Sequence, residues 1–322
     1  MIKFDFWDCG SVLTGLSELY GLDENSILRM NIESLCEDNP IASFVKKANI
    51  KLDAVDVSQV MLHCKHIMTI DDEFEAIKKH GLLPLNKVLT YNTPLHNFLF
   101  EHGIDIDVDN RKLFYKGNEV DLYKYDEECK RCFYGGECKK SLWFNGEPTT
   151  LTYKNMACDF RKGISVLETK LYTDKSEIEV HLSGKLDDVH GYSCVKYNPE
   201  ILTTIEQMIC KLFKESPHLE SDWRKRQAGE YYCLDFDVNI GDFEAITTRP
   251  IFENYEDYFE FNQEPMHELY NVSSNFYGNV FILERALPIL LGDSPTVYGQ
   301  LLPSVKISYN DIKVTKFKVD HF

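Results

Sequence analysis

The stretch His63-Cys64-Lys65-His66-Ile67-Met68-Thr69, with the predicted helix that follows it and ends at Gly81-Leu82, decides how the middle of the chain folds. Its first seven residues favour a short strand. Thr69, with Asp72 three residues later, predicts a capping box at the start of the helix. Gly81 supplies the left-handed residue that ends many helices. The stretch therefore predicts a strand-to-helix unit that carries a histidine and a hydroxyl group.

Helices and strands intermix on both sides of this unit. Residues 1 to about 60 are predicted to be mainly helical, because leucines recur three apart before Gly21 and a second apolar periodicity follows. Residues 61–322 are predicted to form an α+β domain, with strands concentrated after residue 104 and a cysteine-bearing insertion at about 121–160. The predicted fold class is therefore α+β with a helical N-terminal part.

Alternating apolar and polar residues predict two strands, at 176–182 and 230–238. Glu230 begins the second strand on its apolar side, which is costly unless the carboxylate lies at the rim of a pocket. Residues 104–122 are predicted to form a hairpin that turns at Lys116-Gly117-Asn118. A further hairpin is predicted at 305–319, with its turn at Asn310-Asp311.

The charge of the chain limits its partners. The 322 residues carry a formal net charge of −17, so broad non-specific binding of nucleic acid is not expected. Arg224-Lys225-Arg226 is the clearest basic cluster, and a bound polynucleotide would be expected there.

The sequence favours a cytoplasmic protein. The N-terminus lacks the charged and then apolar pattern of a secretory signal. No apolar run approaches the ~20 residues of a membrane span, so no membrane association is expected. The ten cysteines are then expected to be reduced or bound to metal rather than paired as disulfides.

Three cysteines in the insertion follow a C-x2-C-x5-C spacing, and a fourth lies downstream: Cys129, Cys132, Cys138 and Cys158. Two cysteines separated by two residues form a knuckle that holds a soft ion, and zinc is the first candidate. An iron–sulfur cluster also needs cysteine thiolates. The remaining interpretation is a loop with unconnected thiols, because a single knuckle is only half of the zinc signature.

The commonest catalytic motifs do not occur: there is no P-loop, no G-x-G-x-x-G, no G-x-S-x-G and no H-E-x-x-H. A different pattern is carried by His66, Thr69, Ile77, Gly81 and Leu82. It resembles the opening "His-x-Thr, then Ile, then Gly-Leu" of ADP-ribosyltransferases of the diphtheria-toxin-like and DNA-targeting toxin kinds.

The resemblance implies a split β-sheet, mixed or antiparallel, in which His66 and Thr69 hold the ribose and nicotinamide of NAD. It also implies a glutamate on a later strand that orients the ribose and stabilises the cationic transition state. Glu230 is expected to be that residue, and Tyr192 is the candidate for stacking on nicotinamide. Cleavage of the nicotinamide bond builds positive charge on the ribose, which a nearby carboxylate stabilises.

The spacing departs from the family pattern, because two residues separate His66 from Thr69 where the family usually has one. On a strand, the two side chains would then point to opposite faces unless a bulge intervenes. Whether His63 or His66 is the functional histidine therefore stays open.

The sequence thus leads to an NAD-dependent ADP-ribosyltransferase-like enzyme, of the toxin or phage-defence type, that modifies an unknown macromolecule. The alternative is a non-enzymatic protein-interaction module. In that case the cysteines would bind a structural metal, and the N-terminal helices would engage a protein partner.

Overall fold

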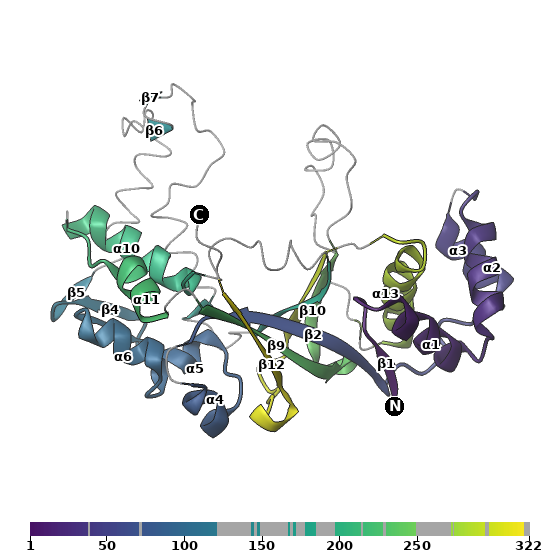
Figure 1. The fold of residues 1–322 in the computed structure, drawn as a ribbon, viewed down its shortest axis with the longest axis horizontal. Coiled ribbons are helices and arrows are strands. Elements are labelled where there is room, and N and C mark those ends of the chain that lie inside the picture. The colour runs from purple at the N-terminus through teal and green to yellow at the C-terminus, as the bar shows by residue number, and fades with distance from the viewer. Residues whose placement is uncertain are drawn as a thin grey trace.

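The structure, a computed structural model, describes residues 1–37, 39–70, 73–120, 178–184, 197–213, 215–227, 230–248, 274–293 and 296–318, together with positions 143–144, 147–148, 167, 170–171 and 272. Helices and strands intermix along these residues, and most strand pairs are antiparallel. The fold class is therefore α+β, as predicted. In Figure 1 the central sheet lies between two groups of helices, so the described elements form an elongated molecule. None of the helices formed by the described residues is long and apolar enough to cross a membrane.

A mixed sheet of seven strands is the centre of the described structure, and its main path follows the order β10-β11-β8-β2-β9-β12. Strand β1 pairs in parallel with β2, whereas the other pairs are antiparallel. The strands are β1 (Ile2–Phe4), β2 (Val60–Met68), β8 (Glu179–Ser183), β9 (Glu230–Asn239), β10 (Phe243–Thr248), β11 (Val297–Leu301) and β12 (Lys313–Lys318). Strands β8 and β9 confirm the two strands predicted from alternation.

Four helices share a hydrophobic core with this sheet: α1 (Cys9–Tyr20), α2 (Glu24–Ser34), α3 (Pro40–Lys47) and α13 (Asn275–Ile289). The sequence defines their ends locally. The Asp8 carboxylate accepts hydrogen bonds from two backbone N–H groups at the start of α1, and Gly21 ends that helix with φ 65°. Asp23 caps α2 in the same way.

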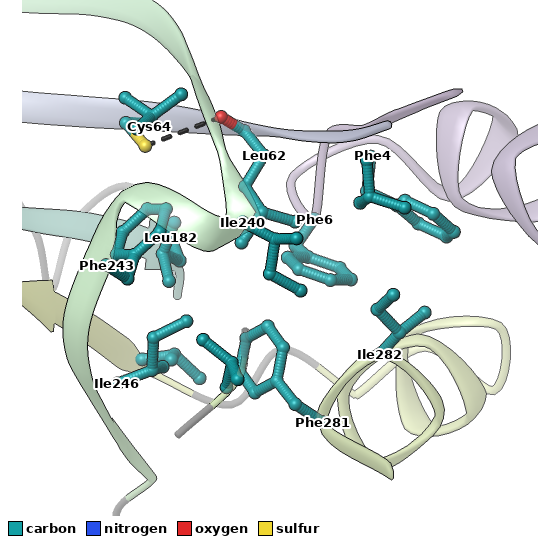
Figure 2. Close-up of a cluster of buried hydrophobic side chains, with 14 of the residues drawn as sticks. Phe4, Phe6, Leu62, Cys64, Leu182, Ile240, Phe243, Ile246, Phe281 and Ile282 are labelled. Atoms are coloured by element: carbon teal, nitrogen blue, oxygen red, sulfur yellow. Dashed lines mark hydrogen bonds between the residues drawn. The ribbon is translucent and has the colours of Figure 1, made fainter. Parts of the chain in front are cut away.

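The main core forms where α13 meets the sheet and the segment after β1. Figure 2 shows Phe281 and Ile282 of α13 turned toward Phe6 and Phe4, with Leu62 of β2 beside them. The rings of Phe6 and Phe281 meet edge to face, with their centroids 6.0 Å apart. Because strand side chains alternate between faces, residues such as Leu62 face this core while their neighbours face the other side.

A second core lies at the other end of the molecule (Figure 1). It is built by α5 (Leu85–Thr90), α6 (Pro94–Glu101), α10 (Glu200–Phe213), α11 (Leu219–Gln227) and a three-stranded sheet of β3 (Ile104–Asp107), β4 (Lys112–Tyr115) and β5 (Asn118–Val120). The predicted turn is confirmed, because Lys116 and Gly117 both have positive φ between β4 and β5, but residues 104–120 form three antiparallel strands instead of one hairpin. Two short strands, β6 (Trp143–Phe144) and β7 (Glu147–Pro148), pair with each other.

The helix after β2 begins later than predicted. Helix α4 spans Glu75–His80, and Phe74 at its N-cap position is left-handed and makes no side-chain cap. The predicted capping box at Thr69 is therefore wrong. The reason is a competing tertiary contact, since the Thr69 hydroxyl is used by Trp223 in the second core.

The end of α4 is as predicted. Gly81 has φ 78°, and a Cβ at this position would lie 2.6 Å from the Ile307 carbonyl oxygen. The N–H of Leu82 donates to that same oxygen at 2.9 Å. Only glycine allows the two segments to approach this closely.

The C-terminal part of the described chain differs from the predicted hairpin. The turn at Tyr309–Asp311 (η3) is present, but the residues before it form only a bridge with Leu82. The residues after it form β12, which pairs with β9 from Lys313 to Lys318. The backbone groups of this segment find their partners on the edge of the main sheet, so the hairpin prediction is wrong.

Candidate functional site

Strands β2 and β9 bring two predicted site residues onto one face of the sheet. The strands pair along their length, and His66 stands opposite Leu234. Because alternate residues of a strand share a face, Glu230 lies on the same face as His66. Leu234 is four positions after Glu230 along β9, which corresponds to about 13 Å at ~3.3 Å per residue. The two side chains thus lie along one strip of the sheet without direct contact.

The imidazole of His66 is oriented by the neighbouring strand. Its Nδ1 lies 2.8 Å from the Glu179 carbonyl oxygen of β8, and because a carbonyl only accepts, Nδ1 carries the proton. Burial lowers the pKa of His66, although this carbonyl opposes the shift. His66 is therefore a neutral imidazole at neutral pH, and its Nε2 has no hydrogen bond with the described residues. That nitrogen is able to accept a hydrogen bond from a hydroxyl group.

The Glu230 carboxylate is held by a lysine on the next strand. Lys316 Nζ lies 2.6 Å from Glu230 Oε2, and the Glu230 side chain is 26% exposed. This hydrogen bond raises the pKa of Lys316. Glu230 is therefore a partly buried carboxylate whose orientation is fixed by its partner on β12.

An aromatic side chain that the sequence did not single out lies between these two residues. Tyr232 of β9 is opposite Met68, shares the face of Glu230, and is half-buried. Its ring meets Phe74 edge to face at a centroid distance of 4.8 Å. The alternating pattern of 230–238 already places Tyr232 on that face. The sequence pattern did not show that this strand pairs with β2. We refer to His66, Met68, Glu230 and Tyr232 as the β2–β9 strip.

Thr69 is not part of this strip. Its Oγ1 accepts a hydrogen bond of 3.0 Å from Nε1 of Trp223, a buried residue of α11. The next residue, Ile70, donates its N–H to the side chain of Gln227 on the same helix. Thr69 therefore connects the end of β2 to the second core, and the structure does not bring it together with His66.

Several predicted site residues lie outside the described residues: Tyr192 and the four cysteines Cys129, Cys132, Cys138 and Cys158. Within the residues that are described, no group of three or more His, Cys, Asp and Glu side chains is arranged to hold a metal ion. The zinc site and the stacking role of Tyr192 stay predictions.

The opposite face of the sheet carries a group of ionised side chains, which we call the polar cluster: Lys3, His63, Lys65, Asp235 and Asp237. His63 lies between the two carboxylates, with Nδ1 at 2.9 Å from Asp237 Oδ1 and Nε2 at 3.3 Å from Asp235 Oδ1. Lys65 pairs with Asp235, and Lys3 pairs with Asp237 at 2.8 Å. Three cations thus face two carboxylates across β1, β2 and β9.

These contacts shift the ionisation of the cluster. Burial alone would lower the pKa of His63, but the hydrogen bonds to Asp235 and Asp237, with the charge of Asp5, outweigh it and raise the pKa. Burial raises the pKa of the Asp235 and Asp237 carboxyl groups. Their hydrogen bonds to cationic partners lower it by more, so the pKa of both groups lies below the usual value. These contacts therefore favour the charged forms of His63, Asp235 and Asp237.

The two histidines of β2 consequently have different capacities. Both ring nitrogens of His63 face carboxylates, and Trp7 covers the ring edge to face at a centroid distance of 6.0 Å. Such an imidazolium has no free nitrogen for a ligand. His66 keeps Nε2 free in a fixed tautomer. We infer that His66 is the better candidate for a binding role, and that His63 holds the strands together.

The predicted basic cluster on α11 is neutralised by nearby side chains. Arg224 pairs with Glu220 at 3.1 Å, and Lys225 pairs with Asp222 at 2.7 Å. Arg226 pairs with Glu101 of α6. A polynucleotide bound at this cluster would have to compete with these carboxylates.

Comparison of the chain with protein-family models, with curated protein sequences and with solved structures found no match.

Proposed function

We propose that this protein is an NAD-dependent ADP-ribosyltransferase-like enzyme that modifies a macromolecular acceptor, as a toxin or a phage-defence effector does. The observation that carries the proposal is the β2–β9 strip, in which His66, Tyr232 and Glu230 follow one another on one face of two paired strands. The histidine and the glutamate are those that the resemblance to ADP-ribosyltransferases implies.

Each residue of the strip has a chemical role in this proposal. The neutral His66, fixed by the Glu179 carbonyl, accepts a hydrogen bond at Nε2 from a ribose hydroxyl. The ring of Tyr232 offers a surface for the nicotinamide ring. When the bond between nicotinamide and the ribose breaks, nicotinamide leaves with the bonding electrons and the ribose becomes cationic. The Glu230 carboxylate stabilises that cation, and the acceptor then adds to the ribose with loss of a proton.

The test measures nicotinamide release from labelled NAD, because this step does not require the acceptor to be known. We expect wild-type protein to release nicotinamide and Glu230→Gln to release it about a hundredfold more slowly, as for loss of one electrostatic stabiliser of a transition state. NAD affinity should change little, because the carboxylate acts mainly after the bond begins to break. Tyr232→Leu should instead weaken NAD binding.

The matched control is Glu119→Gln. Glu119 is also a strand glutamate paired with a lysine, Lys112 at 2.9 Å on the neighbouring strand, but it lies in the second sheet. This variant should release nicotinamide like wild type. A wild-type protein that does not bind NAD would exclude the enzyme. In that case one zinc per chain on metal analysis would support the alternative, a metal-stabilised interaction module.

A further inference from the structure

An open groove of about 540 Å³ runs between α3 and α13. These helices lie beside each other at the end of the molecule that also holds β1 (Figure 1). The β2–β9 strip instead lies at the far end of β2, so the groove is separate from the proposed NAD site. Its existence does not depend on that function.

Both walls of the groove carry apolar side chains at helical spacing. Ile41 and Val45 are four residues apart on α3, and Phe276, Val280 and Glu284 follow at intervals of four on α13. Residues at this spacing share one face of a helix. The Phe276 side chain is 41% exposed, so a large aromatic group stands at the rim. Exposed aromatic residues beside an apolar groove are typical of interaction surfaces.

The Glu284 carboxylate lies in the same groove and has no hydrogen bond with the described residues. Glu284 has a side-chain exposure of 28%, and its nearest cation among the described residues is Arg285 Nη2 at 3.8 Å, beyond hydrogen-bond distance. Burial raises the pKa of Glu284, and Arg285 opposes this shift. A partly desolvated carboxylate is costly until a donor or a cation pairs with it. Among the described residues, Glu284 thus has one long ion pair with Arg285 and no hydrogen bond, so its carboxylate is able to take a further cationic partner.

The wall formed by α3 carries a cation. Lys46 of α3 lines the groove and is exposed, and it forms no ion pair with the part of the chain that the structure describes. The groove thus presents one anion on α13 and one cation on α3, with apolar side chains between them. A ligand with both charges and an apolar face would match this arrangement.

We propose that the groove binds a short amphipathic helix of a partner protein, with its apolar face between α3 and α13 and a Lys or Arg side chain paired with Glu284. A helix fits better than a small molecule, because small-molecule sites enclose most of the ligand, whereas this groove is open along one side. The partner helix supplies the third wall. An acidic residue on it pairs with Lys46.

The test uses a displayed library of 14-residue amphipathic helical peptides. The library is selected on wild-type protein and counter-selected on Val280→Arg, which places a long charged side chain in the groove. We expect enriched peptides to carry Lys or Arg at one position, one helical turn from an apolar residue. For such a peptide, labelled with fluorescein, Glu284→Gln should weaken binding about tenfold, because a hydrogen bond to a charged group is lost.

A double-mutant cycle measures the interaction between Glu284 and the cation of the peptide. Replacing the peptide cation with Gln should weaken binding to wild type but not to Glu284→Gln. The control variant is Glu18→Gln, an exposed glutamate on α1 that should bind like wild type. The absence of any peptide whose binding depends on Val280 would overturn the proposal. So would equal binding of charged and uncharged peptides, or a stable dimer of this chain that Val280→Arg dissociates.

Discussion

His63 and His66 illustrate how much the environment of a residue depends on one position along a strand. They are three residues apart on β2, so their side chains point to opposite faces. His63 meets two carboxylates, which raise its pKa and favour the imidazolium, whereas His66 meets a backbone carbonyl and its burial lowers the pKa and favours the neutral ring. The same residue type thus acts as an ionic link on one face and as a hydrogen-bond acceptor on the other.

This difference predicts a pH-dependent stability at His63. Its pKa is raised above the ordinary 6.5 by Asp235, Asp237 and Asp5, against the opposing effects of burial and of the Lys65 charge. The stabilisation is therefore complete below pH 6.5 and is lost as the pH rises through the raised pKa. The two carboxyl groups have a pKa below 3.8, so their contribution is present above pH 3.8 and is lost as the pH falls through the lowered values.

We expect His63→Gln to lower the free energy of unfolding by about 1–2 kcal/mol at a pH between these limits, and by clearly less when His63 is neutral in wild type. Urea unfolding at about pH 5.5 and at about pH 9 measures the difference. His96→Gln is the control, because among the described residues the His96 ring hydrogen-bonds to the neutral Asn97 amide and forms no ion pair. A pH-independent effect of His63→Gln would contradict the ionic link.

At the scale of secondary-structure elements, the end of β2 is fixed by α11 rather than by the helix that follows it. Trp223 donates to Thr69, and Gln227 accepts from Ile70, so two residues of one helix hold consecutive residues of the chain. The Trp223 ring also packs edge to face on Phe98 of α6, at a centroid distance of 5.0 Å. The end of the strand that carries His66 is therefore held by hydrogen bonds to α11, a helix of the second core.

The Thr69 hydroxyl should contribute measurably to this connection. Thr69→Val keeps the shape of the side chain but leaves the buried Trp223 N–H without a partner, which should cost about 1–3 kcal/mol. Thr69→Ser keeps the acceptor and should cost less. The free energy of unfolding in urea checks both variants. A Thr69→Val protein as stable as Thr69→Ser would show that the hydrogen bond is not needed.

At the scale of the whole molecule, the described residues form two large hydrophobic cores that share few elements, and a small third cluster of Ile67, Tyr231 and Cys233. The main core joins the sheet to the N-terminal helices and α13, and the second core joins α6, α10 and α11 to the small sheet. Separate cores of this kind open as separate cooperative units. The chain passes from the main core to the second core between Leu82 and Leu89, and it finally returns to the main core between α11 and β9.

A reciprocal pair of substitutions tests this division. Leu202 of α10 and Ile282 of α13 are both fully buried, one in each core, and truncation to Ala should cost about 2–5 kcal/mol at either site. Leu202→Ala should speed amide hydrogen exchange in α6, α10 and β3–β5 more than in α1 and α13. Ile282→Ala should give the reverse pattern. Equal acceleration everywhere in both variants would show a single cooperative unit.

The sequence by itself determined the features that depend on residues close together along the chain. Asp8 and Asp23 cap helices, Gly21 and Gly81 end them, and the alternation of apolar residues predicts β8 and β9. Each of these depends on contacts within a few residues, or on a backbone conformation that only glycine adopts readily. The presence of His66 and Glu230 as candidates also follows from sequence, through the family resemblance.

Only the tertiary structure decided which residues meet. The pairing of β2 with β9 joins segments about 170 residues apart, and its register places His63 beside Asp235 and Asp237 and places Tyr232 between His66 and Glu230. Thr69 was expected to cap a helix and instead meets Trp223, 154 residues away. A strand accepts any partner with free backbone groups. The choice of partner and register therefore depends on the packing of both faces of the whole sheet, which no local pattern contains.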